Sequence, residues 1–444
     1  MSRLKLLIDQ ISERFLSREE QSRKLLVNGA RDLVLKGLGL LGFLVMNAVL
    51  ARGLGVEAFG HYAFVLSVVL LLSMAARQGM DSGILRFVSV YSAQQKWGFL
   101  KGVLVWMTIR VGVVAVAISA FGFLAILLTG PAAAPGLRET GFWGLIFLPL
   151  VTLSQINQYA LRGRLWIVHA QIPDLVIRPY GVTLAVALLV LAGISVDGGD
   201  AMAITAISAA VGLVLGWAWL RNSLPGDVFS TEAEHEPSAW RKVSTQLLLV
   251  SGAGLVLTQM DIVMLGLLTT TDESGLYSIA SRLSAISIFA IVALGSIGAP
   301  MIASLYAKED TEALVRLVKL MARISLATLV PMGLLFAVFG PIILGFFGDQ
   351  FVAVYVPLLV LVGGQTLAAC FGPAAMLLTM TSAEDTAARI LLFSVAANLM
   401  LNGLLIPQFG MLGASIATAL TTAIPAGAMF FAVRKRLGVS SAAF

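Results

Sequence analysis

Long apolar segments recur along the chain from about residue 36 to residue 433, separated by short polar stretches. Segments such as 102–129, 201–220 and 411–433 contain about 20 residues or more, the length that an α-helix needs to cross the hydrocarbon core of a bilayer. Long apolar runs favour helices over a closed barrel. The pattern predicts an all-α polytopic membrane protein with twelve spans, or ten or eleven if the segment 33–51 or 388–406 does not cross. The predicted spans are 33–51, 59–76, 102–128, 141–161, 175–195, 201–220, 243–268, 276–303, 324–347, 352–380, 388–406 and 411–433.

The charged residues of the loops predict the orientation. Of the 444 residues, 58% are hydrophobic and only 12% are charged, which excludes a soluble domain of this length. If the loops alternate from a cytoplasmic N-terminus, the inner loops collect most of the Lys and Arg, as the positive-inside rule requires. The loop near Glu384 is the exception, since Arg389 is its only nearby cation. Both termini are therefore expected to be cytoplasmic, and the net charge of +6 is a topology signal rather than a sign of nucleic-acid binding.

The two halves of the chain match at a constant offset. Glu57, Gly60 and Tyr62 fall on Asp272, Gly275 and Tyr277, and Ser89 and Tyr91 fall on Ser304 and Tyr306. With six spans in each half, the repeats insert in the same direction and imply a pseudo-two-fold axis along the membrane normal, with a cavity between two lobes. The predicted N-lobe is 28–220 and the predicted C-lobe is 243–436.

The remaining segments are polar. Residues 1–27 predict either an amphipathic helix on the cytoplasmic leaflet or a frayed polar tail, and they lack the apolar core of a signal peptide. Residues 221–242 predict a cytoplasmic linker between two lobes that move relative to each other, and 437–444 a cytoplasmic tail. The single cysteine, Cys370, excludes an intrachain disulfide. We find no Cys/His cluster for a metal and no cofactor motif, and no paired carboxylates or His–acid motif of a membrane-embedded enzyme.

Three motifs, on the expected spans, resemble those of a known family. They are Leu50-Ala-Arg52-Gly-Leu-Gly-Val-Glu57-Ala-Phe-Gly60-His-Tyr62, then Gln259-Met-Asp261-Ile-Val-Met-Leu-Gly266 with Ser274-Gly-Leu-Tyr277, and Ile406-Pro407-Gln-Phe-Gly410-Met-Leu-Gly413-Ala-Ser. Together they resemble the polysaccharide flippases of the multidrug/oligosaccharidyl-lipid/polysaccharide exporter superfamily, over roughly residues 28–436. No single motif is as specific as a Walker loop; their order carries the resemblance.

The resemblance implies a flippase, not an enzyme, that moves polyprenyl-pyrophosphate-linked oligosaccharides from the cytoplasmic to the periplasmic leaflet of a bacterial inner membrane. It implies alternating access and a role in O-antigen, capsule or exopolysaccharide assembly, with polysaccharide polymerase machinery as a partner besides the bilayer. The alternative is an ion-coupled multidrug exporter of the same fold. The excess of intramembrane Arg and Lys over Asp favours the flippase, because an exporter of organic cations would need an acidic or aromatic cavity.

Charged residues within or near the spans are the candidate site, because intramembrane charges usually face a protein interior or a water-filled cavity. We expect Arg31, Lys36, Arg86 and Arg282 to bind the pyrophosphate, although Arg31 and Lys36 could instead extend to the inner interface. Arg178 and Arg389 are interpreted as interfacial anchors. Asp261 is the lone carboxylate deep in the seventh span, and it is either a structural partner of Arg282 or a coupling-ion site.

Overall fold

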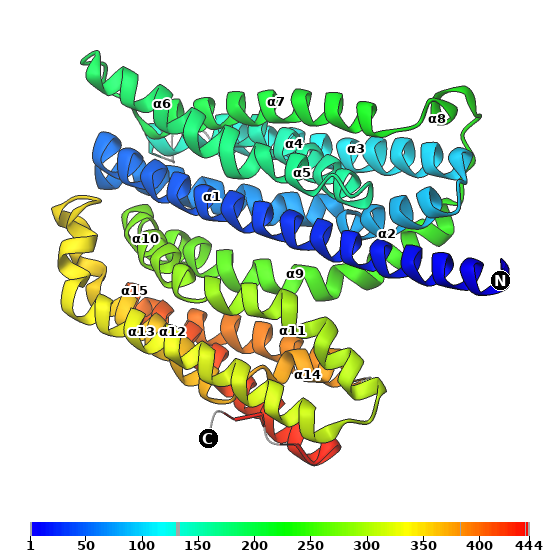
Figure 1. Ribbon diagram of the computed structural model, residues 1–444. Coiled ribbons are helices and arrows are strands. Elements are labelled where there is room, and N and C mark those ends of the chain that lie inside the picture. The colour runs from blue at the N-terminus through cyan, green and yellow to red at the C-terminus, as the bar shows by residue number, and fades with distance from the viewer. Residues whose placement is uncertain (1, 130–133, 382, 440, 443–444) are drawn as a thin grey trace.

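The computed structural model describes residues 2–129, 134–381, 383–439 and 441–442. Within these ranges the side chains of 2–33, 249–251, 289–290, 292–293, 296–297 and 437 are outside the description. Every regular element of the described residues is a helix (Figure 1). The elements are α1 (Ser2–Arg77), α2 (Met80–Ala93), α3 (Trp97–Thr129), α4 (Pro135–Gly163), α5 (Ile167–Ile172), the π-helical turn η2 (Pro173–Ile177), α6 (Arg178–Leu191), α7 (Gly198–Ser223), α8 (Gly226–Ser230), α9 (Pro237–Leu268), α10 (Thr271–Ser287), α11 (Phe289–Ala307), α12 (Thr311–Gly345), the 3₁₀ turn η3 (Asp349–Val354), α13 (Tyr355–Cys370), α14 (Ala374–Met380) and α15 (Glu384–Leu437).

Two of these helices each cross the membrane twice. The apolar part of α1, Val34–Arg77, has 44 residues. At 1.5 Å per residue this is about 66 Å, roughly twice the hydrocarbon thickness. The helix reverses at Gly55, where φ is 75°, and α15 does the same at Gly410, where φ is 53°. Glycine adopts these angles because it has no Cβ. The predicted spans 33–51 and 59–76 are therefore two helices joined by a non-helical reversal at Gly55, and the spans 388–406 and 411–433 are joined in the same way at Gly410.

The other crossings complete the predicted twelve. In the described part of the chain, seven helices, or eight with the bent α9, are long and apolar enough to span by themselves, with α1 and α15 each counted once. The remaining crossings are α4 and the α10–α11 pair, of which α4 and α10 contain buried polar side chains, whereas α11 is strongly apolar. Asn157 and Gln158 of α4 are buried, and so are Ser274 and Ser278 of α10. The predicted fold class is confirmed.

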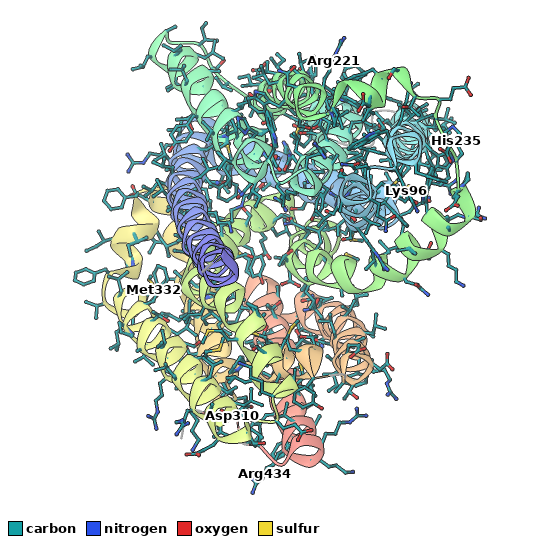
Figure 2. All side chains as sticks on the ribbon, turned by 45° about the vertical axis from the view of Figure 1, so that its right-hand side comes forward. Lys96, Arg221, His235, Asp310, Met332 and Arg434 are labelled. Carbon is teal, nitrogen blue, oxygen red and sulfur yellow. The ribbon has the colours of Figure 1, made fainter. Side chains whose placement is uncertain are left out.

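The helices form two lobes (Figure 1). Helices α1 to α7 lie on one side and α9 to α15 on the other, with α1 along the border. The bends at Gly55 and Gly410 and the α6–α7 turn lie at one end, which we call the bend end. The start of α1 and α8 lie at the opposite end, which we call the linker end, and this end is the one predicted to be cytoplasmic. Figure 2, turned to bring the linker end forward, shows Lys96, Arg221 and His235 on the N-lobe and Asp310 and Arg434 on the C-lobe.

The sequence repeat reappears as a contact between the lobes. A Cβ placed on Gly275 would lie 2.7 Å from the Cα of Gly60, its partner at the repeat offset. Two residues that a two-fold axis exchanges can touch each other only if both lie beside that axis. The pseudo-two-fold axis therefore passes between α1 and α10 near the bend end.

The predicted linker, 221–242, packs against the N-lobe and is hydrogen-bonded to it. The backbone N–H of Glu234 donates to the carbonyl of Gly98 on α3, and the buried indole of Trp240 donates to the Tyr91 hydroxyl at 3.0 Å. The first half of α9 continues this contact, because a Cβ on Gly83 of α2 would touch Ser244. The two halves of α9, Pro237–Leu248 and Gly252–Leu268, differ in direction by 52°. Relative motion of the lobes therefore needs bending within α9 rather than in the linker.

Candidate functional site

A cavity of about 180 Å³ lies between the two lobes. One wall comes from the N-lobe, from α1, α6 and α7, and the other comes from α9 and α10 of the C-lobe. Two arginines line it together with hydroxyl, amide and apolar side chains, and no carboxylate is among the described lining residues. The lining residues are Phe43, Met46, Tyr62, Leu66, Leu70, Arg178, Thr205, Thr258, Gln259, Ile262, Ser281, Arg282 and Ala285.

Arg282 extends from α10 across the lobe boundary. Its guanidinium lies 5.0 Å from the centre of the Phe43 ring on α1, a cation–π contact between the lobes. Its Nη1 is buried without a hydrogen-bond partner in the described structure. A buried guanidinium with an unused donor is costly, and an anion in the cavity would relieve that cost.

Arg178 places a second cation in the same cavity. It is the first residue of α6 and follows the π-helical turn η2. Its Nη2 lies 3.5 Å from the Asp174 carboxylate, which also accepts a hydrogen bond from Gln158 at 2.9 Å. The ion pair uses Nη2, and the other N–H groups of the Arg178 guanidinium can donate to a ligand in the cavity. From its sequence position Arg178 is expected to be an interfacial anchor, but the structure places it on the cavity wall.

A signal for Arg178 was present in the sequence. Asp174 and Arg178 stand four residues apart inside an apolar span, between Pro173 and Pro179. An acid–base pair at this spacing shares one helix face. Prolines loosen the regular hydrogen bonding of a helix, and π-helical turns recur at functional sites.

The other predicted substrate-binding residues do not meet Arg282 in this cavity. Lys36 is half-buried on α1 but is not a lining residue, and Arg86 is exposed on α2. The side chain of Arg31 lies outside the described residues. The assignment of these three to the head-group path stays a prediction.

Asp261 sits in a separate buried cluster within the C-lobe. Its carboxylate accepts hydrogen bonds from the Tyr277 hydroxyl at 2.9 Å, from the Asn402 amide at 2.6 Å and from the Thr418 hydroxyl. The amide of Asn402 also donates to Asn398, at 3.1 Å. Four helical segments thus converge on one carboxylate: α9, α10 and the two halves of α15.

The structural ion pair between Asp261 and Arg282 does not form. Each described partner of Asp261 is a neutral donor, while Arg282 is directed to Phe43 in the inter-lobe cavity. The sequence could have indicated the true partners, since Asn398 and Asn402 are amides four residues apart in an apolar span and therefore share a helix face.

Comparison with known proteins decides the family. The profile of the polysaccharide biosynthesis protein family matches residues 32–306, more than half of the chain. The chain belongs to the polysaccharide biosynthesis protein family. This family agrees with the resemblance that the three motifs carry.

Two archaeal proteins resemble this family member over part of their length. It is 27% identical over 229 residues to the probable low-salt glycan biosynthesis flippase Agl15 of Haloferax volcanii, covering 51% of this chain and 48% of that protein. It is 32% identical over 168 residues to the probable flippase AglR of the same organism, covering 36% and 35%. The alignments thus span at most about half the length of these curated relatives.

Solved structures share the fold of this polysaccharide biosynthesis protein. An inward-facing multidrug resistance MATE family transporter superposes with a TM-score of 0.74 at 13% identity, over 92% of this chain and 98% of that one. The lipid II flippase MurJ, in an inward closed conformation, gives 0.70 at 14% identity, over 91% and 87%. At such low identity the likeness shows the two-lobe fold and leaves the substrate open.

Proposed function

We propose that this protein is a flippase for polyprenyl-pyrophosphate-linked oligosaccharides, whose polar head passes between the lobes while the polyprenyl tail stays in lipid. The observation that carries the proposal is the inter-lobe cavity with Arg178 and Arg282 on opposite walls. Membership of the polysaccharide biosynthesis protein family and the flippase names of its relatives support it.

The charge of the cavity supports the flippase over the multidrug exporter. Arginine offers a planar fork of donors that matches phosphate oxygens, and such contacts are strongest where water is scarce. The described lining holds two arginines and no carboxylate. Asp174 offsets the charge of Arg178 from outside the lining, so Arg282 in particular attracts a pyrophosphate and repels the organic cations that a multidrug exporter would carry. Tyr62, Thr205 and Gln259 add neutral groups suited to sugar hydroxyls.

The size of the cavity requires a conformational change. A volume of about 180 Å³ suits a pyrophosphate but not an oligosaccharide, so the lobes must separate before the glycan can pass. At the bend end they are held together by the Gly60–Gly275 contact and by the edge-to-face rings of Phe59 and Phe351, 5.7 Å apart. Alternating access is our proposal for how these contacts open.

We further propose that Asp261 is the coupling site for H⁺ or Na⁺. A single carboxylate surrounded by neutral oxygen-bearing groups carries one negative charge that a monovalent cation can neutralise. Because Asp261 and its partners lie on four helical segments, loss of the charge would change how these segments pack. An Asp261→Asn variant should fold normally, yet its transport should no longer respond to a cation gradient. If proteoliposome transport keeps its full gradient dependence, Asp261 is structural.

The proposed cellular setting follows the sequence analysis. It is a bacterial inner membrane with both termini cytoplasmic, where the flippase supplies O-antigen, capsule or exopolysaccharide assembly and works beside polysaccharide polymerase machinery.

The head-group site is tested by arginine substitution. Arg282→Ala should lose most transport, and Arg282→Lys should retain part of it, because lysine keeps the charge but loses the fork. Arg178→Ala should also reduce transport. Complementation of a flippase-deficient strain measures this, with the membrane level of each variant determined in parallel.

The matched control is Arg389→Ala. Arg389 is exposed on α15 and donates to the carbonyl of Asp385, away from the cavity. It should complement like the unmodified protein. Normal transport by Arg282→Ala, or failure only because that protein is absent from the membrane, would make Arg282 structural. Export of organic cations by the unmodified protein would favour the exporter instead.

A further inference from the structure

A large apolar groove lies on the outer surface of the N-lobe, away from the inter-lobe cavity. Helices α3, α7 and α8 form it at the linker end, and its volume is about 690 Å³, within the range of about 300–1,000 Å³ typical of ligand sites. Most of its lining is aliphatic or aromatic. The lining residues are Lys101, Leu104, Val105, Trp217, Ala218, Leu220, Arg221, Leu224, Val228 and Phe229.

Two cations stand at this groove, and the described lining contains no acidic residue to neutralise them. The Nζ of Lys101 donates to the carbonyls of Phe229 and Thr231, at 3.2 and 2.9 Å, which leaves one of its three N–H groups for a ligand. The guanidinium of Arg221 lies 5.9 Å from the centre of the Phe229 ring, and Arg221 is exposed. Both charges are thus held at fixed places beside an apolar hollow.

The groove lies at the level of the membrane interface. Arg221 is in the last turn of α7, and Lys101 is within the first turns of α3, so both are near the ends of spanning helices. Trp217 and Phe229 are about half exposed there, as aromatic residues at a membrane–water interface commonly are. A ligand at this depth would have its polar head at the two cations and its chain along the apolar wall.

We propose that this groove binds an anionic phospholipid of the surrounding bilayer, with its phosphate head between Lys101 and Arg221 and an acyl chain against Val105 and Trp217. Any apolar groove that faces a bilayer binds acyl chains, so the apolar lining does not select one lipid over another. The two cations select lipids with an anionic headgroup. Lys101 on α3 also donates to the carbonyls of Phe229 and Thr231 in the linker. A lipid phosphate bound to Lys101 would therefore stabilise the attachment of the linker to α3. This site is independent of the transported substrate.

The test uses Trp217 as a reporter in the full-length protein. The protein is reconstituted in phosphatidylcholine vesicles that contain equal mole fractions of either dibrominated phosphatidylglycerol or dibrominated phosphatidylcholine. The Trp217 signal is the fluorescence difference from a Trp217→Phe variant in the same vesicles. At low salt we expect several-fold stronger quenching by brominated phosphatidylglycerol, and the preference should shrink as salt rises.

Two variants connect the preference to the groove. Arg221→Gln should bring the two quenching curves together, whereas Arg241→Gln, which removes an exposed arginine at the same end but outside the groove, should leave them apart. Val105→Phe, which fills the groove, should reduce quenching by both lipids. Equal quenching by the two lipids in the unmodified protein, or an unchanged preference in Arg221→Gln, would overturn the proposal.

Discussion

Two buried charged residues in this protein have opposite surroundings. Asp261 is hydrogen-bonded by three neutral side chains from α10 and α15, whereas the buried Nη1 of Arg282 has no partner among the described residues. A fully hydrogen-bonded carboxylate stabilises the fold in the absence of any ligand. A guanidinium with an unused buried donor can bind a ligand that enters from outside, which is why we propose Arg282 as a substrate-binding residue.

The Asp261 cluster predicts a measurable contribution to stability. Asn402→Leu should lower the free energy of unfolding by about 1–2 kcal/mol, because the carboxylate loses a donor and the protein interior offers no replacement. Thr422→Val is the matched control, since among the described residues the Thr422 hydroxyl donates to the carbonyl of Thr418 on its own helix and to no side chain. Thermal unfolding in detergent measures both variants. Equal unfolding temperatures for the two would show that the cluster does not hold α9 and α15 together.

At the scale of elements, close helix packing closes the bend end. Gly60 and Gly275 let α1 and α10 meet at backbone distance, and Arg52 donates to the carbonyl of Gly345, the last residue of α12, at 3.1 Å. A cation at a helix C-terminus also offsets the negative end of the helix dipole. These contacts join the lobes on the side away from the linker, so the transport that we propose through the cavity requires them to separate.

A larger side chain on α10 at this contact should separate the two lobes at the bend end. In Gly275→Val the new side chain would meet the backbone of Gly60, which cannot move aside without parting the lobes. A cysteine at Thr205, introduced into a Cys370→Ser background, should then react faster with an impermeant maleimide added from the bend end. Gly363→Val is the control, since no atom of the described part of the chain would lie within 4 Å of a Cβ there. Equal labelling rates in the two variants would contradict a closure at Gly60 and Gly275.

At the scale of the whole molecule, the even number of crossings places the start of α1 and α8 at the same end (Figure 1). The first half of α9 belongs mechanically to the N-lobe, through Trp240 and Ser244, and its second half to the C-lobe, through Asp261. The bend between these halves is therefore the connection through which one lobe can turn relative to the other.

The orientation in the membrane is a prediction from loop charge alone. Reporter fusions near Glu234 and at Phe444 should show cytoplasmic activity, and a fusion at Asp197 should show periplasmic activity. The reason is the excess of Lys and Arg in the loops of the linker end. An outside reading at Phe444 would refute the even number of crossings.

Residue matches at a constant offset predicted the two-fold repeat, and the apolar pattern by itself predicted the membrane class and the twelve crossings. It could do so because each span must satisfy its own backbone in lipid, whatever its neighbours are. Gly60 and Gly275 could be matched from the sequence alone, because an internal duplication is a property of the chain. Of the site, the sequence singled out Arg282 and Asp261 as charges within apolar spans.

Only the tertiary structure decided what these residues contact. Arg178 joins Arg282 in one cavity, and Asp261 pairs with Asn402 and Thr418 rather than with Arg282, because helices far apart in the sequence pack side by side. The attachment of the linker to α3 likewise depends on the close approach that Gly98 and Gly102 allow. A periodic pattern shows which residues share a helix face, but the neighbour of that face is chosen by packing among all twelve spans.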